Sequence, residues 1–172
     1  MSMESSEKDP ILLLPDEAYI GNEPDFIITT LDACISVTLH HPRSGTGAIV
    51  HSRLPTDPHR EERLLLPALG LPFGRDGHCF RYIDSSINRL VRIFRAFGIK
   101  TEEILAGIYG GATLRCHEVE MTSLGQKNVA AAMDWLNKYH IVIDRQETGG
   151  NMSRRIEFNV VSGEVRVSPL ES

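Results

Sequence analysis

The chain has 172 residues, of which 41% are apolar and 24% are charged, and its formal net charge is −5. This length and composition fit one globular domain and exclude a disordered chain. An acidic chain repels a phosphate backbone, so nucleic acid is not expected as a partner. No apolar run approaches the roughly 18 residues of a membrane span, and no signal peptide is visible, so we expect a cytoplasmic protein without membrane insertion.

The N-terminal part of the chain predicts three strands after a polar leader. We expect residues 1–23 to be a partly disordered N-terminal segment, and residues 24–172 to form a single domain. Residues 26–39 are rich in Ile, Val and Thr and break only at residues 31–33, which predicts two strands joined by a tight turn. Residues 47–54 predict a third strand.

The middle and C-terminal parts predict two helices and four more strands. Residues 55–77 contain four prolines and predict an insertion or lid. Apolar residues at spacings of three and four predict a helix over residues 79–97, which Gly98 caps. The other predicted elements are a buried strand at 104–109 that ends at Gly110 and Gly111, a helix at 126–139 with Ser123 as its possible cap, and strands at 141–145, 155–160 and 164–167.

The order of these elements favours one fold class. The succession β-β-β-α-β-α-β-β-β has too few βαβ alternations for a doubly wound parallel sheet. We therefore expect an α+β layered fold with mostly antiparallel strands.

Cys34 is the first candidate for a catalytic residue, because it lies at the exit of the predicted turn, where a side chain can face a cleft. A thiolate is a strong nucleophile, and a neighbouring imidazole can lower the pKa of the thiol and form an ion pair with it at neutral pH. His51, on the third predicted strand, could meet Cys34 across paired strands, which lie about 4.8 Å apart. The alternative is a buried core cysteine and a hydrogen-bonded interior histidine. The spacing of the two residues leaves both interpretations open.

We expect no metal site and no cofactor. Cys79 beside His78, and Cys116 beside His117, lack the second pair of ligands that zinc requires. The glycine pairs of the chain match neither the phosphate-binding loop pattern nor the dinucleotide-binding pattern.

Other polar residues are expected at the surface. His40 and His41 precede a proline at a strand end, and because adjacent side chains point to opposite faces, the two cannot chelate a metal together. Arg53 and Arg81 belong to a series of arginines mixed with carboxylates, which predicts a solvated face.

Six segments in a fixed order carry a family resemblance. Residues 24–35 (PDFIITTLDACI) contain Cys34, and residues 47–55 (GAIVHSRLP) contain His51. The others are RYIDSSI at 81–87, IYGGA at 108–112, LGQKNV at 124–129, and TGGNMSRRIEF at 148–158 with SGEVRV at 162–167. Together they resemble the bacterial chemoreceptor glutamine deamidases known as CheD.

The resemblance implies a three-layer α/β sandwich and a protein-glutamine deamidase that acts on chemoreceptors. Cys34 would attack the side-chain amide of a receptor glutamine to form a thioester, and His51 would act as base and then as acid. Backbone N–H groups of the turn would bind the oxyanion. The family's threonine, which orients the histidine, corresponds to Thr29, with Thr30 as the runner-up. The implied partners are chemotaxis receptors and a CheC-type phosphatase.

The turn before Cys34 departs from the family pattern. Leu31, Asp32 and Ala33 stand where the family has a glycine-rich turn with a serine before the cysteine. A carboxylate at Asp32 disfavours a nearby thiolate unless it is paired or turned away. The departure leaves open a second interpretation, a weakly active or inactive CheD-like binding module that regulates a CheC-type phosphatase or a receptor array.

Overall fold

The computed structural model describes residues 8–58, 80–113 and 119–170, with only the backbone described for 119–123. The described strands are β1 (Ile11–Leu12), β2 (Ala18–Gly21), β3 (Phe26–Leu31), β4 (Ile35–His41), β5 (Thr46–Ser52), β6 (Leu105–Gly110), β7 (Val142–Thr148), β8 (Arg154–Asn159) and β9 (Val165–Pro169). The helices are α1 (Ile83–Ala96), α2 (Val119–Lys138) and a 3-10 turn at Thr101–Glu103. In the part of the chain that the structure describes, neither long helix is apolar enough to cross a bilayer.

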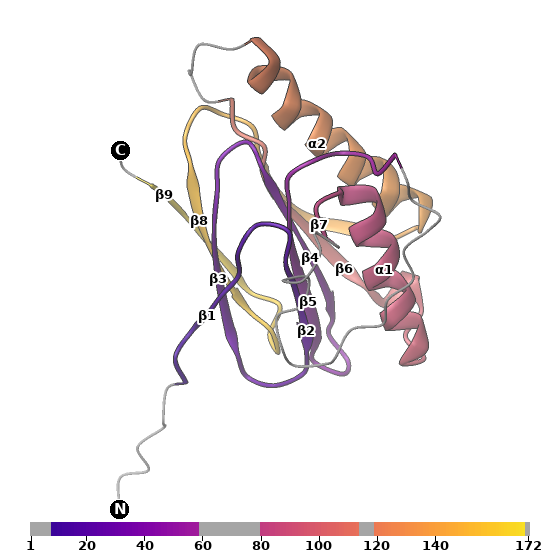
Figure 1. The fold of residues 1–172 in the computed structure, drawn as a ribbon. Coiled ribbons are helices and arrows are strands. Elements are labelled where there is room, and N and C mark those ends of the chain that lie inside the picture. The colour runs from indigo at the N-terminus through magenta and orange to yellow at the C-terminus, as the bar shows by residue number, and fades with distance from the viewer. Residues whose placement is uncertain (1–7, 59–79, 114–118, 171–172) are drawn as a thin grey trace, which may run out of the picture.

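The strands form two mixed sheets, and the two helices cover one of them (Figure 1). One sheet has the order β1-β3-β8-β9 and the other has the order β2-β5-β4-β6-β7. The pairs β1–β3 and β6–β7 are parallel, and the other five pairs are antiparallel. The predicted α+β class is confirmed.

Two apolar cores result from the alternation of side chains on the five-stranded sheet. Ile35, Val37 and Leu39 of β4 pack with α1 and α2 in the first core. Ile49 of β5 faces the other way and packs with β3 and β8 in the second core, between the two sheets. Because successive side chains point to opposite faces, the residues that alternate with the first core lie between the sheets.

The predicted turn at Asp32 joins two sheets and is not a hairpin. β3 and β4 follow each other in the chain, but β3 pairs with β1 and β8, whereas β4 pairs with β5 and β6. The structure also has two strands, β1 and β2, within residues 1–23, which we expected to be partly disordered. Both strands are too short to show a clear alternation in the sequence.

Several predicted features move or fall outside the structure. Helix α2 already begins at Val119, so Ser123 lies inside the helix and is not its cap. Most of the insertion or lid expected at residues 55–77 lies outside the described residues, because the description stops at residue 58 and resumes at residue 80.

The expectation that His40 and His41 lie at the surface is wrong. Their exposed fractions are 9% and 6%. The Nε2 atom of His40 lies 2.8 Å from the carbonyl oxygen of Val161, and the Nδ1 atom of His41 lies 2.7 Å from the hydroxyl of Ser44. The turn after β8 folds over this end of β4, and the sequence alone does not reveal that contact.

Candidate active site

The register of the five-stranded sheet places Cys34 and His51 on one face. Ser36 of β4 is the direct partner of His51 on β5, and Cys34 precedes Ser36 by two residues. Side chains two residues apart share a face. Accordingly, half-buried Cys34 packs against the core between the two sheets, and that is also the side from which Thr29 reaches His51.

Thr29 reaches His51 from the opposite sheet. The hydroxyl oxygen of Thr29 lies 2.8 Å from Nδ1 of His51, and the same hydroxyl donates to the carbonyl oxygen of Leu13 at 2.9 Å. A hydroxyl has a single proton, so Thr29 must accept from the ring, which assigns the hydrogen of His51 to Nδ1. Nε2 then carries the lone pair. The neighbouring Thr30 is exposed and does not face His51.

His51 is neutral in this environment. Its exposed fraction is 2%. Burial, opposed by the charge of Asp16, lowers the pKa of His51 to about 4. Among the described residues, Nε2 has no hydrogen-bond partner. The structure therefore holds a buried imidazole with an unused basic nitrogen.

The pKa of Cys34 favours the thiol over a thiolate–imidazolium pair at neutral pH. Burial raises the pKa of Cys34 to about 11, the positive charge of Arg53 opposes the shift, and the negative charges of Asp32 and Asp16 add to it. No hydrogen bond joins the sulfur to His51 among the described residues. Catalytic contacts of this kind often tighten only when substrate binds.

The turn that carries Cys34 is packed against two glycines. Gly111 donates its N–H to the carbonyl oxygen of Cys34 at 2.9 Å. Gly110 has a φ of 99°, and a Cβ atom at this position would collide with the same carbonyl oxygen. The hydroxyl of Ser153 donates to the carboxylate of Asp32. Asp32 is thus paired, one of the two conditions named for a nearby thiolate, although its charge still raises the pKa of the Cys34 thiol.

Two N–H groups of the turn lack a backbone acceptor in the described part of the chain. They are the N–H groups of Ala33 and Cys34. Donors of this type, next to a nucleophile, can bind an oxyanion.

Comparison with known protein families shows to which family the chain belongs. Residues 65–169 match the family model for CheD, described as CheD chemotactic sensory transduction. The chain belongs to the CheD family. The matched range begins after Cys34 and His51, but pairwise alignments with CheD relatives extend over those residues as well.

The CheD relatives are similar over most of their length. A probable chemoreceptor glutamine deamidase CheD of Maridesulfovibrio salexigens is 27% identical over 99% of this chain and 98% of that protein. The corresponding protein of Nitratidesulfovibrio vulgaris is 31% identical over 88% of this chain and 72% of its own length. The chemoreceptor glutamine deamidase CheD of Thermotoga maritima is 28% identical over 88% and 86%. A solved structure, the hypothetical protein YfiH of Bacillus licheniformis, matches 77% of this chain and 50% of that chain with a TM-score of 0.45 and 11% identity.

The segment between β1 and β2 holds the backbone of His51, a contribution to the site that the sequence did not lead us to expect. The N–H of Asp16 donates to the carbonyl of His51 at 2.9 Å, and the N–H of His51 donates to the carbonyl of Glu17 at 3.0 Å. Asp16 has a φ of 68°, in the left-handed region that Asp tolerates. The Pro15-Asp16 pair is the sequence signal that indicates a turn here.

The expectation that Arg53 and Arg81 lie on a mixed solvated face is wrong in part. The guanidinium of Arg53 donates to both carboxylate oxygens of buried Asp16, through Nε at 2.8 Å and through Nη2. Arg81 also pairs with Asp16, at 3.5 Å. Ile35 pairs with Ser52 in the antiparallel ladder, so Arg53, which follows Ser52, lies opposite Cys34, which precedes Ile35. The ion pairs with Asp16 therefore hold a positive charge near Cys34.

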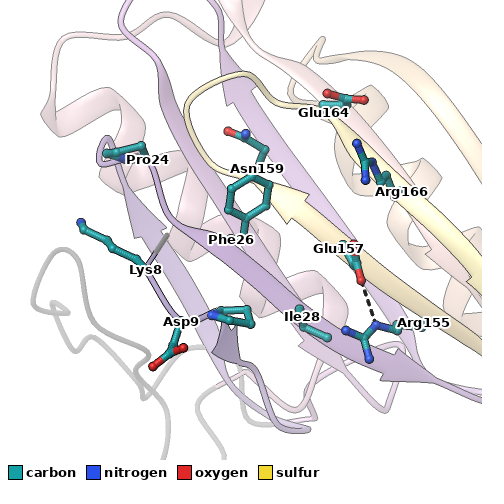
Figure 2. Close-up of a pocket in the computed structure, with 11 residues that line it drawn as sticks. Lys8, Asp9, Pro24, Phe26, Ile28, Arg155, Glu157, Asn159, Glu164 and Arg166 are labelled. Atoms are coloured by element: carbon teal, nitrogen blue, oxygen red, sulfur yellow. Dashed lines mark hydrogen bonds and ion pairs between the residues drawn. The ribbon is translucent and has the colours of Figure 1, made fainter. Parts of the chain in front are cut away.

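A pocket of about 800 Å³ lies on the other face of the four-stranded sheet. Figure 2 shows Phe26 and Ile28 of β3 lining it, with the ion pair of Arg155 and Glu157 on β8. Thr29 alternates with these β3 residues and points inward, so this pocket is separate from the site at Cys34. Among the described residues, no group of three or more His, Cys, Asp or Glu side chains is arranged to hold a metal ion.

Proposed function

We propose that this chain is a protein-glutamine deamidase, a hydrolase that converts side-chain amides of bacterial chemoreceptors to carboxylates in chemotaxis signalling. The observation that carries the proposal is the arrangement of Thr29, His51 and Cys34. A buried imidazole is held at Nδ1, its Nε2 has no partner among the described residues, and a cysteine lies on the same face, just before the neighbouring strand. Membership of the CheD family supports the same reaction.

Cys34 is the nucleophile and His51 is the general base. Because both groups are neutral at rest, Nε2 of His51 removes the thiol proton as sulfur attacks the amide carbon. The tetrahedral intermediate collapses when Nε2 returns this proton to the leaving nitrogen, which departs as ammonia. A thioester remains on Cys34. His51 then takes a proton from water, the hydroxide adds to the thioester, and glutamate and the thiol are released.

Thr29 and the turn backbone support these steps. During proton transfer the ring of His51 becomes an imidazolium, and Thr29 keeps the Nδ1–H in place because its hydroxyl already donates to Leu13. The N–H of Cys34, which has no backbone acceptor among the described residues, donates a hydrogen bond to the oxyanion. Arg53 favours the thiolate that develops on Cys34 during attack.

We further infer the cellular setting from the family resemblance. The partners are chemotaxis receptors as substrates and a CheC-type phosphatase as regulator, in the cytoplasm. We also infer that the fold is the three-layer, mostly antiparallel sandwich of the CheD family, which two sheets and a layer of two helices support.

Mass spectrometry of receptor cytoplasmic fragments tests the reaction. Incubation with the wild-type protein is expected to replace NH₂ by OH on particular glutamines, with release of an equal amount of ammonia. Cys34→Ala is expected to abolish the conversion, and Cys116→Ala is the matched control that keeps it. Conversion that survives in Cys34→Ala, or no conversion on any receptor, overturns the proposal.

One observation favours the second candidate, a CheD-like binding module with weak catalysis. The pKa of Cys34 is raised by burial and by the charge of Asp32, which stands in the altered turn. This function predicts that wild type and Cys34→Ala bind a CheC-type phosphatase or receptor fragments equally well, without deamidation. Calorimetric titration with both proteins measures it, and loss of all partner binding rules it out.

A further inference from the structure

Asn128 is a buried polar residue on α2 that the reaction of Cys34 and His51 does not account for. Its exposed fraction is 0%. It lies on the face of α2 that packs on the five-stranded sheet, where Ala132 and Leu136 follow at intervals of four residues. A polar side chain on such a face requires partners.

The partners of Asn128 are two backbone carbonyls beside the nucleophile. Its Nδ2 donates to the carbonyl oxygen of Ala33 at 3.2 Å and to that of Arg53 at 3.0 Å. Both hydrogens of the amide are used. Among the described residues, its Oδ1 has no partner. An unsatisfied buried acceptor is destabilising, so core packing alone does not explain an asparagine here.

These two carbonyls lie just beyond the end of a ladder. The last pair of the β4–β5 ladder is Ile35 with Ser52. Ala33 precedes Cys34 and Arg53 follows Ser52, and no backbone hydrogen bond joins Cys34 to Arg53 among the described residues. The side chain of Asn128 bridges the two strands at the level of the nucleophile.

The hydrogen bond from Asn128 also sets the orientation of the Ala33–Cys34 peptide, because that peptide is trans. The carbonyl of Ala33 and the N–H of Cys34 belong to one peptide plane and point in opposite directions. We propose that Asn128 is a positioning residue, which holds the Ala33–Cys34 peptide so that the N–H of Cys34 points away from α2 and toward the sulfur, as a donor to the oxyanion. The role as donor rests on the proposed deamidase function, whereas the orientation of the peptide does not.

The surroundings of the peptide support this orientation. The N–H of Cys34 has no backbone acceptor among the described residues. It also contributes to lowering the pKa of its own thiol, as a hydrogen bond to the sulfur would. Gly125, one turn before Asn128, packs so closely on Gly111 that a Cβ atom would collide with the Gly111 carbonyl. This contact fixes α2 against the Cys34 turn.

The orientation can be measured without any enzyme assay. Ala33-Cys34 is the one Ala-Cys pair in the sequence, so protein labelled with ¹³C-carbonyl Ala and ¹⁵N-Cys gives a single carbonyl–amide cross-peak. Asn128→Ala and Asn128→Ser are expected to move the carbonyl shift upfield, because the carbonyl loses its donor or keeps a more distant one, and to move the Cys34 amide shift, because the peptide is then free to turn. Asn137→Ala, an exposed residue on the same helix, is the matched control and leaves the peak in place.

Kinetics on receptor fragments then separates orientation from a merely structural role. Asn128→Ala is expected to lower kcat about 10- to 100-fold with KM changed less than about 2-fold, since the oxyanion donor acts only in the transition state. The rate of Cys34 alkylation by iodoacetamide is expected to fall much less than kcat, because that reaction forms no oxyanion and loses only the contribution of the N–H to the thiol pKa.

Each outcome decides the proposal. A cross-peak that stays in place in both Asn128 variants overturns it, whether or not the wild type deamidates receptors. A moved peak with unchanged kcat, or an equal fall of kcat and alkylation rate, overturns the role in oxyanion binding. If the wild type deamidates no receptor, the proposed function fails, and the cross-peak alone decides whether Asn128 orients the peptide. Asn128→Ser is the second variant if Asn128→Ala does not fold.

Discussion

The base and the nucleophile of this site are held by different means. His51 lies inside β5, which pairs with β2 on one side and β4 on the other, and Thr29 fixes its ring from the opposite sheet. Cys34 lies outside any strand, in a turn that is held by hydrogen bonds from three distant residues, Gly111, Asn128 and Ser153. Regular β structure therefore determines the position of the base, whereas contacts from segments distant in sequence determine the position of the nucleophile.

The largest effect is expected from removal of the base. His51→Gln should lower kcat by about 1,000-fold, because general acid–base catalysis contributes about 10²- to 10⁴-fold and His51 serves in each proposed proton transfer. The rate of deamidation of receptor fragments measures it. His41→Gln is the control, since His41 is also buried and bonded to a hydroxyl but lies at the far end of β4. Equal losses in the two variants would contradict the assignment of His51 as base.

A comparison of two glycines tests the packing of the nucleophile turn. Gly110 and Gly98 both have positive φ, at 99° and 78°, but a Cβ atom on Gly98 meets nothing within 4 Å, whereas on Gly110 it collides with the Cys34 carbonyl. Gly98→Ala is expected to cost about 1 kcal/mol of unfolding free energy, from backbone strain alone, and Gly110→Ala about 3 kcal/mol or more. Urea unfolding measures both. Similar values would mean that the turn can move away without cost.

The neutral state of His51 predicts a pH dependence of stability. The unfolded chain binds a proton at a pKa near 6.5, and the folded chain only near 4, so the stabilisation is complete above 6.5 and is lost as the pH falls toward 4. The maximal loss is about 3 kcal/mol of unfolding free energy. Urea unfolding at pH 7, 5.5 and 4 in wild type and His51→Gln isolates this residue. Parallel pH profiles in the two proteins would show that His51 titrates normally.

The smallest effect is expected at Thr29. Thr29→Val should lower kcat about 10-fold, because the ring of His51 loses the acceptor that fixes its tautomer. It should also cost about 1–2 kcal/mol of unfolding free energy, since the carbonyl of Leu13 loses its donor. Thr29→Ser keeps the hydroxyl and should restore most of both quantities. Exposed Thr30→Val is the control, and a larger loss of kcat there would contradict the role of Thr29.

Local sequence patterns were sufficient to predict the helices and strands in which apolar or β-branched residues recur regularly over many positions. Apolar spacing predicted α1 to within one residue at its C-terminal end and four residues at its start, and Ile, Val and Thr runs predicted β3, β4 and β5. The turn before Cys34 was also visible, because three residues interrupt two such runs. The sequence also contains an indication for Asn128 that we did not use: it is a polar residue four positions before Ala132, on the buried face of a predicted helix.

The tertiary structure alone decided how these parts meet. Two strands that adjoin in sequence enter different sheets, so Thr29 faces His51 across the interior and not along one sheet. The neutral charge states of Cys34 and His51 follow from burial between those sheets, which no spacing in the chain expresses. Periodicity records which face of an element is apolar, but pairing depends on contacts between residues far apart in sequence, such as Asn128 with Ala33. The sequence by itself therefore determined the elements and the candidate residues, and the packing of distant segments determined their geometry and protonation.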